Sequence, residues 1–338
     1  MLYSLARSAL FQLDAERAHE LTIETFKHLP RLATAPFAGR AVDDPVKLFG
    51  LNFPNRVGLA AGLDKNGECI EAWARLGFGF IEVGTVTPRP QPGNPKPRMF
   101  RLVEQQALIN RLGFNNKGVD YLLQQVAQAD YQGILGINIG KNADTPIDRA
   151  ADDYLICLRK VYQAASYVTI NISSPNTKNL RDLQDEARLE ALLQSLAAER
   201  RALAQQHGKQ TPMLVKIAPD VSELQLDHIA RLARELGIDG LIATNTTLSR
   251  PGLQAEPLAR EAGGLSGAPL EQLACETLRK LRARAGADYP LVGVGGICAG
   301  EDARARRRAG ADLLQVYTGF IYHGPPLVTA CAEAARNR

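Results

Sequence analysis

The chain has 338 residues, of which 45% are apolar and 22% charged, and 40 Lys and Arg stand against 36 Asp and Glu. This composition excludes a disordered chain, a collagen-like repeat and a small disulfide-stapled protein. A net charge of +4 over 338 residues is too small for a nucleic-acid-binding surface, so we expect no nucleic-acid partner. The length fits two domains, or one α/β barrel with about 90 residues more than a typical barrel of about 250.

The first 45 residues carry two helical patterns. Apolar residues recur with a spacing of three or four positions over 2–13 and again over 18–29. Asp14 is a suitable N-cap for the second helix, and Pro30 is expected to end it. We expect residues 1–45 to form a small two-helix extension. The helices either form a lid on the rest of the protein or meet a membrane surface or a lipophilic ligand.

Eight short β-rich runs follow, separated by helical patterns such as 187–206 and 223–236. Strands that alternate with helices predict a (β/α)8 TIM barrel, an α/β fold, over residues 46–338. A doubly wound sheet is the competing fold, but the number of runs and the absence of a GxGxxG motif after the first disfavour it. The runs span residues 57–60, 80–83, 134–137, 168–171, 213–216, 241–244, 291–294 and 313–316.

Polar residues gather where these runs end, which is the catalytic face of a barrel. Three of the connections are long, 87–132, 174–186 and 247–270, and long loops after barrel strands usually build the site or cover it. The polar residues at or after the strand ends are Lys65, Thr85, Asn138, Asn171, Lys216, Asn245 and Tyr317.

Glycines follow the last two runs. Gly295, Gly296 and Gly319 stand there, and Gly267 lies in the preceding long loop. Backbone N–H groups exposed at such positions form the usual phosphate site of a barrel. The pattern predicts a phosphorylated substrate or a nucleotide cofactor such as FMN.

Lys216 lies in an apolar strand and therefore needs an anionic partner. It could form a Schiff base, as in barrel aldolases, or stabilise the charge of a reduced flavin. The many amides, together with Thr244 and Thr246, suit a planar ring with alternating C=O and N–H groups. Ser174 is either a turn serine or a base whose proton passes to water. The amides are Asn110, Asn138, Asn171, Asn176 and Asn245.

Two further patterns have plainer interpretations. The densest basic run, Arg304 and Arg306 to Arg308, is expected to form a solvated helix face. The five cysteines show neither a metal-ligand nor a disulfide spacing, so we expect no metal site and a reduced intracellular protein. No run of apolar residues is long enough to span a bilayer.

Seven segments carry motifs that together resemble the class 2, quinone-dependent dihydroorotate dehydrogenases over nearly the whole chain. The resemblance implies a flavoprotein oxidoreductase of pyrimidine biosynthesis that oxidises (S)-dihydroorotate to orotate, with FMN as hydride acceptor and a membrane quinone as final electron acceptor. The segments are 60–67, 82–94, 110–116, 138–142, 171–177, 216–220 and 263–267.

The resemblance implies one non-covalent FMN, held by Ala61, Gly62, Leu63, Asp64, Lys65, Thr85, Asn138, Asn171, Lys216, Thr244, Gly267, Gly296, Tyr317 and Thr318. It implies substrate binding by Lys65, Asn110, Arg111, Leu112, Gly113, Phe114, Asn171, Asn176, Asn245 and Thr246. Ser174 would be the catalytic base that removes the C5 proton of dihydroorotate while hydride leaves C6, and Lys65 would face the substrate carboxylate. Class 1 relatives have Cys at the position of Ser174, so this Ser favours class 2.

The same resemblance gives the N-terminal helices a role. They would meet lipid and enclose a path for a ubiquinone-type quinone, near His19, Arg101 and Tyr317. It implies a peripheral protein on the cytoplasmic face of the bacterial inner membrane, without an obligate protein partner. The rival hypotheses are a class 1 enzyme that uses fumarate or NAD, a Schiff-base aldolase, and a non-catalytic membrane-surface module.

Overall fold

The computed structural model describes residues 2–38 and 41–336. Residues 1 and 39–40 of the predicted extension, and 337–338 of the predicted barrel segment, lie outside the described residues.

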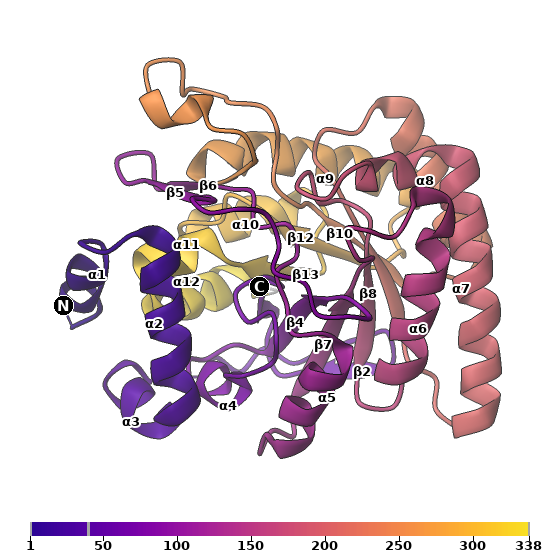
Figure 1. The fold of residues 1–338 in the computed structure, drawn as a ribbon, viewed down its shortest axis with the longest axis horizontal. Helices are drawn as coiled ribbons and strands as arrows, with labels where there is room; N and C mark the ends of the chain where they lie inside the picture. The colour runs from indigo at the N-terminus through magenta and orange to yellow at the C-terminus, as the bar shows by residue number, and fades with distance from the viewer. Residues whose placement is uncertain (1, 39–40, 337–338) are drawn as a thin grey trace.

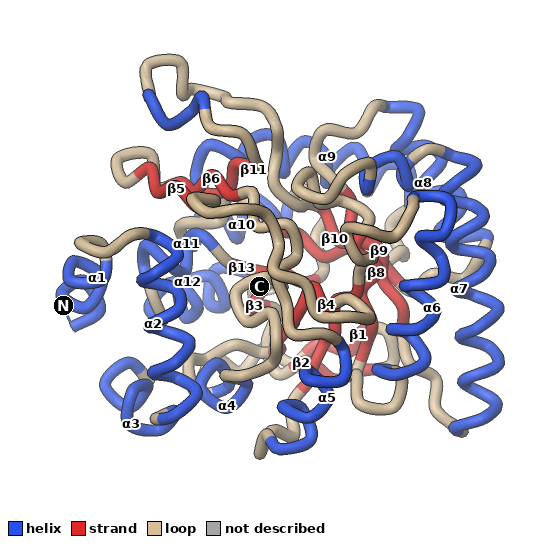
Figure 2. Tube along the Cα trace, in the orientation of Figure 1, coloured by secondary structure: helices blue, strands red, loops and turns tan. Residues whose placement is uncertain are grey.

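Within the described residues, eight parallel strands close into a barrel, which confirms the predicted fold (Figures 1 and 2). The strand residues are buried on both faces, and this is why the sequence shows short continuous apolar runs rather than alternation. Neighbours around the barrel follow chain order. The strands are β3 (Val57–Leu59), β4 (Phe80–Val86), β7 (Ile134–Ile139), β8 (Tyr167–Asn171), β9 (Met213–Ile217), β10 (Gly240–Ala243), β12 (Leu291–Val294) and β13 (Leu313–Val316).

Helices connect the strands and cover the outside of the barrel (Figure 1). The helical patterns at 187–206 and 223–236 form α7 (Glu186–His207) and α8 (Glu223–Glu235), and α8 begins with a capping box between Ser222 and Gln225. The helices are α4 (Ile70–Ala74), α5 (Val119–Gln128), α6 (Ala150–Val161), α7 (Glu186–His207), α8 (Glu223–Glu235), α9 (Glu271–Ala285), α10 (Gly300–Arg308), α11 (Thr318–His323) and α12 (Pro325–Ala335).

The N-terminal extension forms α1 (Leu2–Leu10), α2 (Ala15–His28) and α3 (Pro30–Thr34), which lie beside α4 and α11 and away from α6 and α7 (Figure 1). Asp14 caps α2 as predicted, because its side chain accepts hydrogen bonds from the N–H groups of Glu16 and Arg17. Pro30 does end α2, but it also opens α3 as its first residue, where a missing N–H costs nothing. None of the described helices combines the length and apolar character needed to cross a membrane.

The long connections contain structure that the sequence analysis missed. Strands β5 (Met99–Leu102) and β6 (Ala107–Asn110) form a hairpin, and β11 (Gly264–Gly267) pairs with the other edge of β6. Two loops far apart in the chain thus share one antiparallel sheet. A second hairpin, β1 (Val46–Leu48) and β2 (Leu51–Phe53), packs Phe53 edge-on against Phe80 inside the barrel, with ring centroids 5.2 Å apart.

Candidate active site

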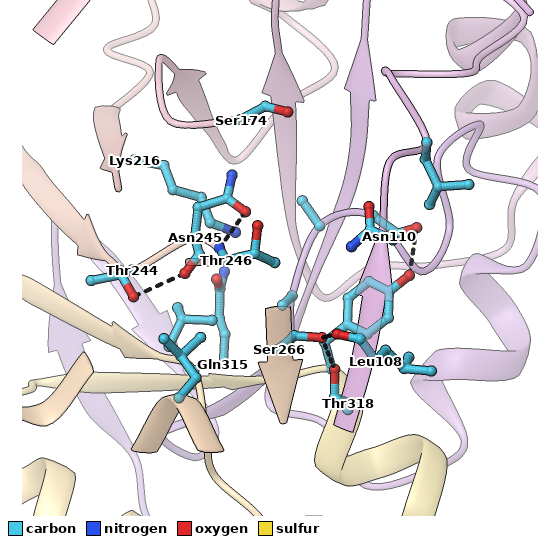
Figure 3. A pocket seen from close by; sticks show the side chains of 18 of the residues that line it. Leu108, Asn110, Ser174, Lys216, Thr244, Asn245, Thr246, Ser266, Gln315 and Thr318 are labelled. Carbon is cyan, nitrogen blue, oxygen red and sulfur yellow. Dashed lines mark hydrogen bonds between the residues drawn. The ribbon is translucent and has the colours of Figure 1, made fainter. Parts of the chain in front are cut away.

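A cavity lies where the barrel strands end and the long loops meet. Figure 3 shows Ser174 on one side of it, Ser266 and Thr318 on the opposite side, and Asn245 and Thr246 between them. Most of the predicted site residues line this one cavity. They are Ala61, Gly62, Lys65, Thr85, Asn110, Leu112, Gly113, Phe114, Asn171, Ser174, Asn176, Lys216, Thr244, Asn245, Thr246, Gly267, Gly296, Tyr317 and Thr318.

Four of the residues predicted to bind FMN or the substrate do not line the cavity. The carboxylate of Asp64 turns away and accepts hydrogen bonds at the start of α4, including one of 2.8 Å from the N–H of Cys69. Leu63 is buried and lines a neighbouring cavity. The guanidinium of Arg111 points outward to Glu261, 2.6 Å away. The fourth, Asn138, lies beneath the cavity floor.

Asn138 belongs to a chain of buried hydrogen bonds under the cavity. Thr85 Oγ1 donates to Asn138 Oδ1 at 2.6 Å, and Asn171 Nδ2 donates to Thr85 Oγ1 at 2.8 Å. Asn138 Nδ2 in turn donates to Glu82 Oε1 at 2.8 Å. Because each donor in this network meets an acceptor, the network fixes which way each amide points.

Glu82, which the sequence analysis missed, is a fully buried carboxylate inside the barrel. Its Oε2 accepts hydrogen bonds from the hydroxyl of Tyr167 at 2.9 Å and from Gln315 Nε2 at 2.7 Å. Burial lowers the pKa of Lys216, and the charge of Glu82 opposes this effect. Lys216 lines the cavity, so its amino group is available to a ligand there.

The end of the cavity near Ser174 is rich in amides. Ser174 Oγ accepts a hydrogen bond of 3.2 Å from the N–H of Asn176, and Asn176 Nδ2 donates to Asn110 Oδ1 at 3.1 Å. Thr246 Oγ1 is buried and has no hydrogen-bond partner among the described residues. This end therefore offers several oriented donors and acceptors to a polar ligand.

The loop after β8 is anchored beside this end by one arginine. Arg181 lies on a 3₁₀ helix within the predicted loop 174–186. Its Nε donates to Ser173 O at 3.1 Å and its Nη2 donates to Thr246 O at 2.8 Å. A single side chain thus ties the loop to the segments that follow β8 and β10.

The opposite end is built from tight turns. Gly296 has a φ of +73°, and a Cβ there would lie 2.2 Å from the Cα of Glu271, so only glycine fits. Thr318 Oγ1 donates to Ser266 Oγ at 2.8 Å, which places two hydroxyls beside Gly267. Backbone N–H groups and hydroxyls in this arrangement are suited to binding a phosphate.

The position of Arg306 differs from what the sequence predicted for the basic run. The run from Arg304 to Arg308 was predicted to be a solvated face, but the Arg306 side chain is fully buried. Its Nη2 donates to Gly295 O at 2.6 Å and to Glu271 O at 3.2 Å. The prediction is wrong for Arg306 because α10 turns this residue inward, where it supports the glycine turn from below.

A second cavity lies between the N-terminal helices and α11. It is lined largely by Ala, Leu, Ile and Phe side chains, and His19, Arg101 and Tyr317 all line it. Burial, with a further contribution from the charge of Lys65, lowers the pKa of His19 to about 3, so this imidazole is neutral at physiological pH. Tyr317 lines both cavities and forms part of the wall between them.

Comparison with known proteins identifies the family. The family model of dihydroorotate dehydrogenase matches residues 45–335. A dihydroorotate dehydrogenase (quinone) of Paraburkholderia phymatum is 57% identical over 338 residues, which are all of this chain and 98% of the relative. One of Burkholderia cenocepacia is 58% identical over 339 residues, with the same coverage.

Solved structures agree with this result. A crystal structure of DHODH from Eimeria tenella in complex with ferulenol superposes with a TM-score of 0.88 at 37% identity, over 95% of this chain and 90% of that one. The ligand-free structure from the same organism gives a TM-score of 0.85 at 39% identity, over 93% of each chain. The chain therefore belongs to the dihydroorotate dehydrogenase family, in its quinone-dependent class.

Proposed function

We propose that the barrel cavity binds FMN and dihydroorotate together, and that the apolar cavity admits the quinone. The reaction of the family is the oxidation of dihydroorotate to orotate in pyrimidine biosynthesis. The observation that carries the assignment of the cavities is the convergence of a buried lysine, a glycine-rich end and an amide-rich end in one space.

The residues of the barrel cavity fit FMN. Lys216 has no anionic partner in contact with it among the described residues, and Gly267, Gly296 and Thr318 offer a phosphate site at one end. The segment 61–65 would contribute main-chain groups, since the side chains of Leu63 and Asp64 point elsewhere. When bound, FMN accepts a hydride and passes two electrons to the quinone. Thr85, Asn171, Thr244 and Tyr317 complete the proposed lining, and Asn138 would act from beneath it through its hydrogen bond with Thr85.

Dihydroorotate would lie at the amide-rich end. Lys65, which is half-buried and lines the cavity, would pair with the substrate carboxylate. The partnerless Thr246 Oγ1 and the amides of Asn110, Asn171, Asn176 and Asn245 would hold the ring. The main chain of 111–114 would form one wall.

Ser174 would accept the C5 proton while a hydride leaves C6, so that the C5=C6 double bond of orotate forms. Among the described residues, no ionisable side chain is hydrogen-bonded to Ser174. Its own hydroxyl proton must therefore pass to water, and we expect the reaction to be faster at alkaline pH.

The apolar cavity and the helices around it suit a quinone and a lipid surface. Leu2 and Leu5 on α1 and Leu32 on α3 are 60%, 68% and 70% exposed, close to the cavity. We propose that residues 1–45 serve membrane contact and quinone access, that 46–338 form the catalytic barrel, and that the protein binds the cytoplasmic face of the inner membrane.

The absorption spectrum of the purified protein tests this function. We expect a flavin spectrum that bleaches on anaerobic addition of dihydroorotate and returns faster with decylubiquinone than with fumarate. Faster reoxidation by fumarate would favour a class 1 reaction. The aldolase hypothesis would instead be favoured by a colourless protein in which borohydride reduction links a carbonyl substrate covalently to Lys216.

A further inference from the structure

A buried ion pair joins the N-terminal extension to the loop that leads into β5. Glu16 on α2 and Arg98 have side chains that are each only 7% exposed. Arg98 Nη2 donates to Glu16 Oε1 at 2.8 Å, and Nε lies 3.1 and 3.2 Å from the two carboxylate oxygens. Because both charges are removed from water, the pair is held in one geometry, and loss of either partner leaves a buried charge.

The remaining guanidinium nitrogen of Arg98, Nη1, binds the loop before β5. It donates to Pro92 O at 2.6 Å and to Asn94 O at 2.7 Å. The planar guanidinium therefore binds a helix carboxylate on one side and two loop carbonyls on the other. The position of this loop consequently depends on α2.

Asn94 extends this restraint to the barrel cavity. Asn94 Nδ2 donates to Arg111 O at 2.8 Å and to Asn176 O at 3.2 Å. The N–H of Arg111 also donates to Arg98 O at 2.8 Å. The main chain of 110–114 and of Asn176, which forms the proposed substrate end, is thus held by two residues that α2 positions.

The same ion pair acts on the charge of Lys65. Burial lowers the pKa of Lys65 to about 8, while the charges of Glu16 and Asp64 raise it and that of Arg98 lowers it. His19, also on α2, is neutral in this environment and adds no charge. A neutral residue in place of Glu16 would therefore leave Lys65 deprotonated at a lower pH.

We propose that Glu16, Arg98 and Asn94 are positioning residues for dihydroorotate, through which helix α2 of the N-terminal extension holds the substrate-binding segments in place. These three residues are described by the structure, and none of them lines either cavity. They therefore act on the substrate through the main chain of 110–114 and Asn176. The inference rests on the proposed function of the barrel cavity.

The first test is Glu16→Gln in the full-length, FMN-loaded protein. Gln keeps the size of the side chain and one acceptor for Arg98. We expect the dissociation constant for orotate, measured from the flavin spectrum, to rise at least fivefold at pH 7.5. We also expect its pH dependence to shift to lower pH. The rate of reoxidation by decylubiquinone should stay within about twofold of the wild type.

A matched control lies on the same helix. Glu20 pairs with Lys96 at 2.7 Å, but the two side chains are 40% and 56% exposed, and an exposed pair contributes little. Glu20→Gln should therefore leave orotate affinity, its pH dependence and quinone turnover unchanged.

A second variant, Asn94→Ala, leaves the ion pair and every charge intact. We expect weaker orotate binding with an unshifted pH dependence, which separates the restraint on the loop from the charge on Lys65. This variant also keeps the proposal testable if Glu16→Gln does not fold.

Unaltered orotate affinity in Glu16→Gln overturns the proposal. If only Asn94→Ala folds, unaltered orotate affinity in that variant overturns it. So does an equal loss of orotate binding and quinone turnover, because that indicates general destabilisation. Failure of the wild type to bleach with dihydroorotate refutes the proposed function itself, so the two failures are distinguishable.

Discussion

The two cavities of this protein are neighbours with opposite chemistry. The barrel cavity is lined by amides, hydroxyls, glycines and two lysines that come from strand ends and the loops after them. The second cavity is lined mainly by apolar side chains from α1, α2 and α11. The difference supports the proposed division, with a polar, anionic substrate in one cavity and a lipid-soluble oxidant in the other.

Tyr317 stands in the wall between them. Its hydroxyl donates to Gly62 O at 3.2 Å, and a Cβ at Gly62 would lie 3.0 Å from the tyrosine ring. The tyrosine ring is therefore packed closely against Gly62 and held in place. Under the proposed function, this contact separates the space for a polar substrate from the space for an apolar oxidant.

The largest expected effect comes from Ser174→Ala in the polar cavity. The variant should keep its flavin and lose dihydroorotate oxidation by about 10³-fold, since a positioned base contributes about 10² to 10⁴. Stopped-flow bleaching of the flavin measures the rate. Thr177→Val on the same loop, whose buried Oγ1 has no partner among the described residues, should react normally. A near-normal rate in Ser174→Ala would show that Ser174 is not the base.

Filling the apolar cavity should separate the two half-reactions. Ala18 on α2 lines this cavity and is buried. Ala18→Leu places a larger side chain where the quinone would lie, so we expect reoxidation by decylubiquinone to slow about twentyfold while bleaching by dihydroorotate is unchanged. Arg17→Ala, at the exposed neighbouring position, is the control. Equal slowing of both half-reactions would contradict the division between the cavities.

The charge of Lys65 predicts a pH dependence confined to the polar cavity. Burial lowers its pKa to about 8, so the side chain is cationic below this pH and neutral above it. Orotate is an anion and binds the cationic form, so its dissociation constant should rise about tenfold between pH 7 and pH 9. Titration of orotate against the flavin spectrum measures this change. A flat profile over this range would show that Lys65 does not pair with the carboxylate.

The smallest expected effect concerns the outer surface of the N-terminal helices. Leu5→Ser should weaken binding to lipid vesicles about fivefold, because an exposed leucine contributes about 1 kcal/mol when lipid covers it. Flavin bleaching should not change. Leu224→Ser is a matched control, since Leu224 is 63% exposed on α8 in the barrel wall. Equal vesicle binding by the two variants would argue against membrane contact through α1.

Much of the fold could be predicted from the sequence because its signals are local. Eight buried runs, two amphipathic patterns and the cap at Asp14 each depend on residues close together in the chain. Parallel strands in a barrel bring their C-terminal ends to one face, so the polar residues after them, such as Lys216 and Asn245, could be expected to meet.

Only the tertiary structure decided the contacts between distant segments. The pairing of β11 with β6, the inward turn of Arg306 and the carboxylate of Glu82 inside the barrel leave no periodic signal in the sequence. The ion pair of Glu16 and Arg98 is of the same kind, because 82 positions separate its partners. Periodicity and capping are set by neighbours within a few residues, whereas these contacts depend on how whole elements pack. The sequence by itself therefore determined the barrel strands, the N-terminal helices and the chemistry at the strand ends, and packing determined how the N-terminal helices support the site.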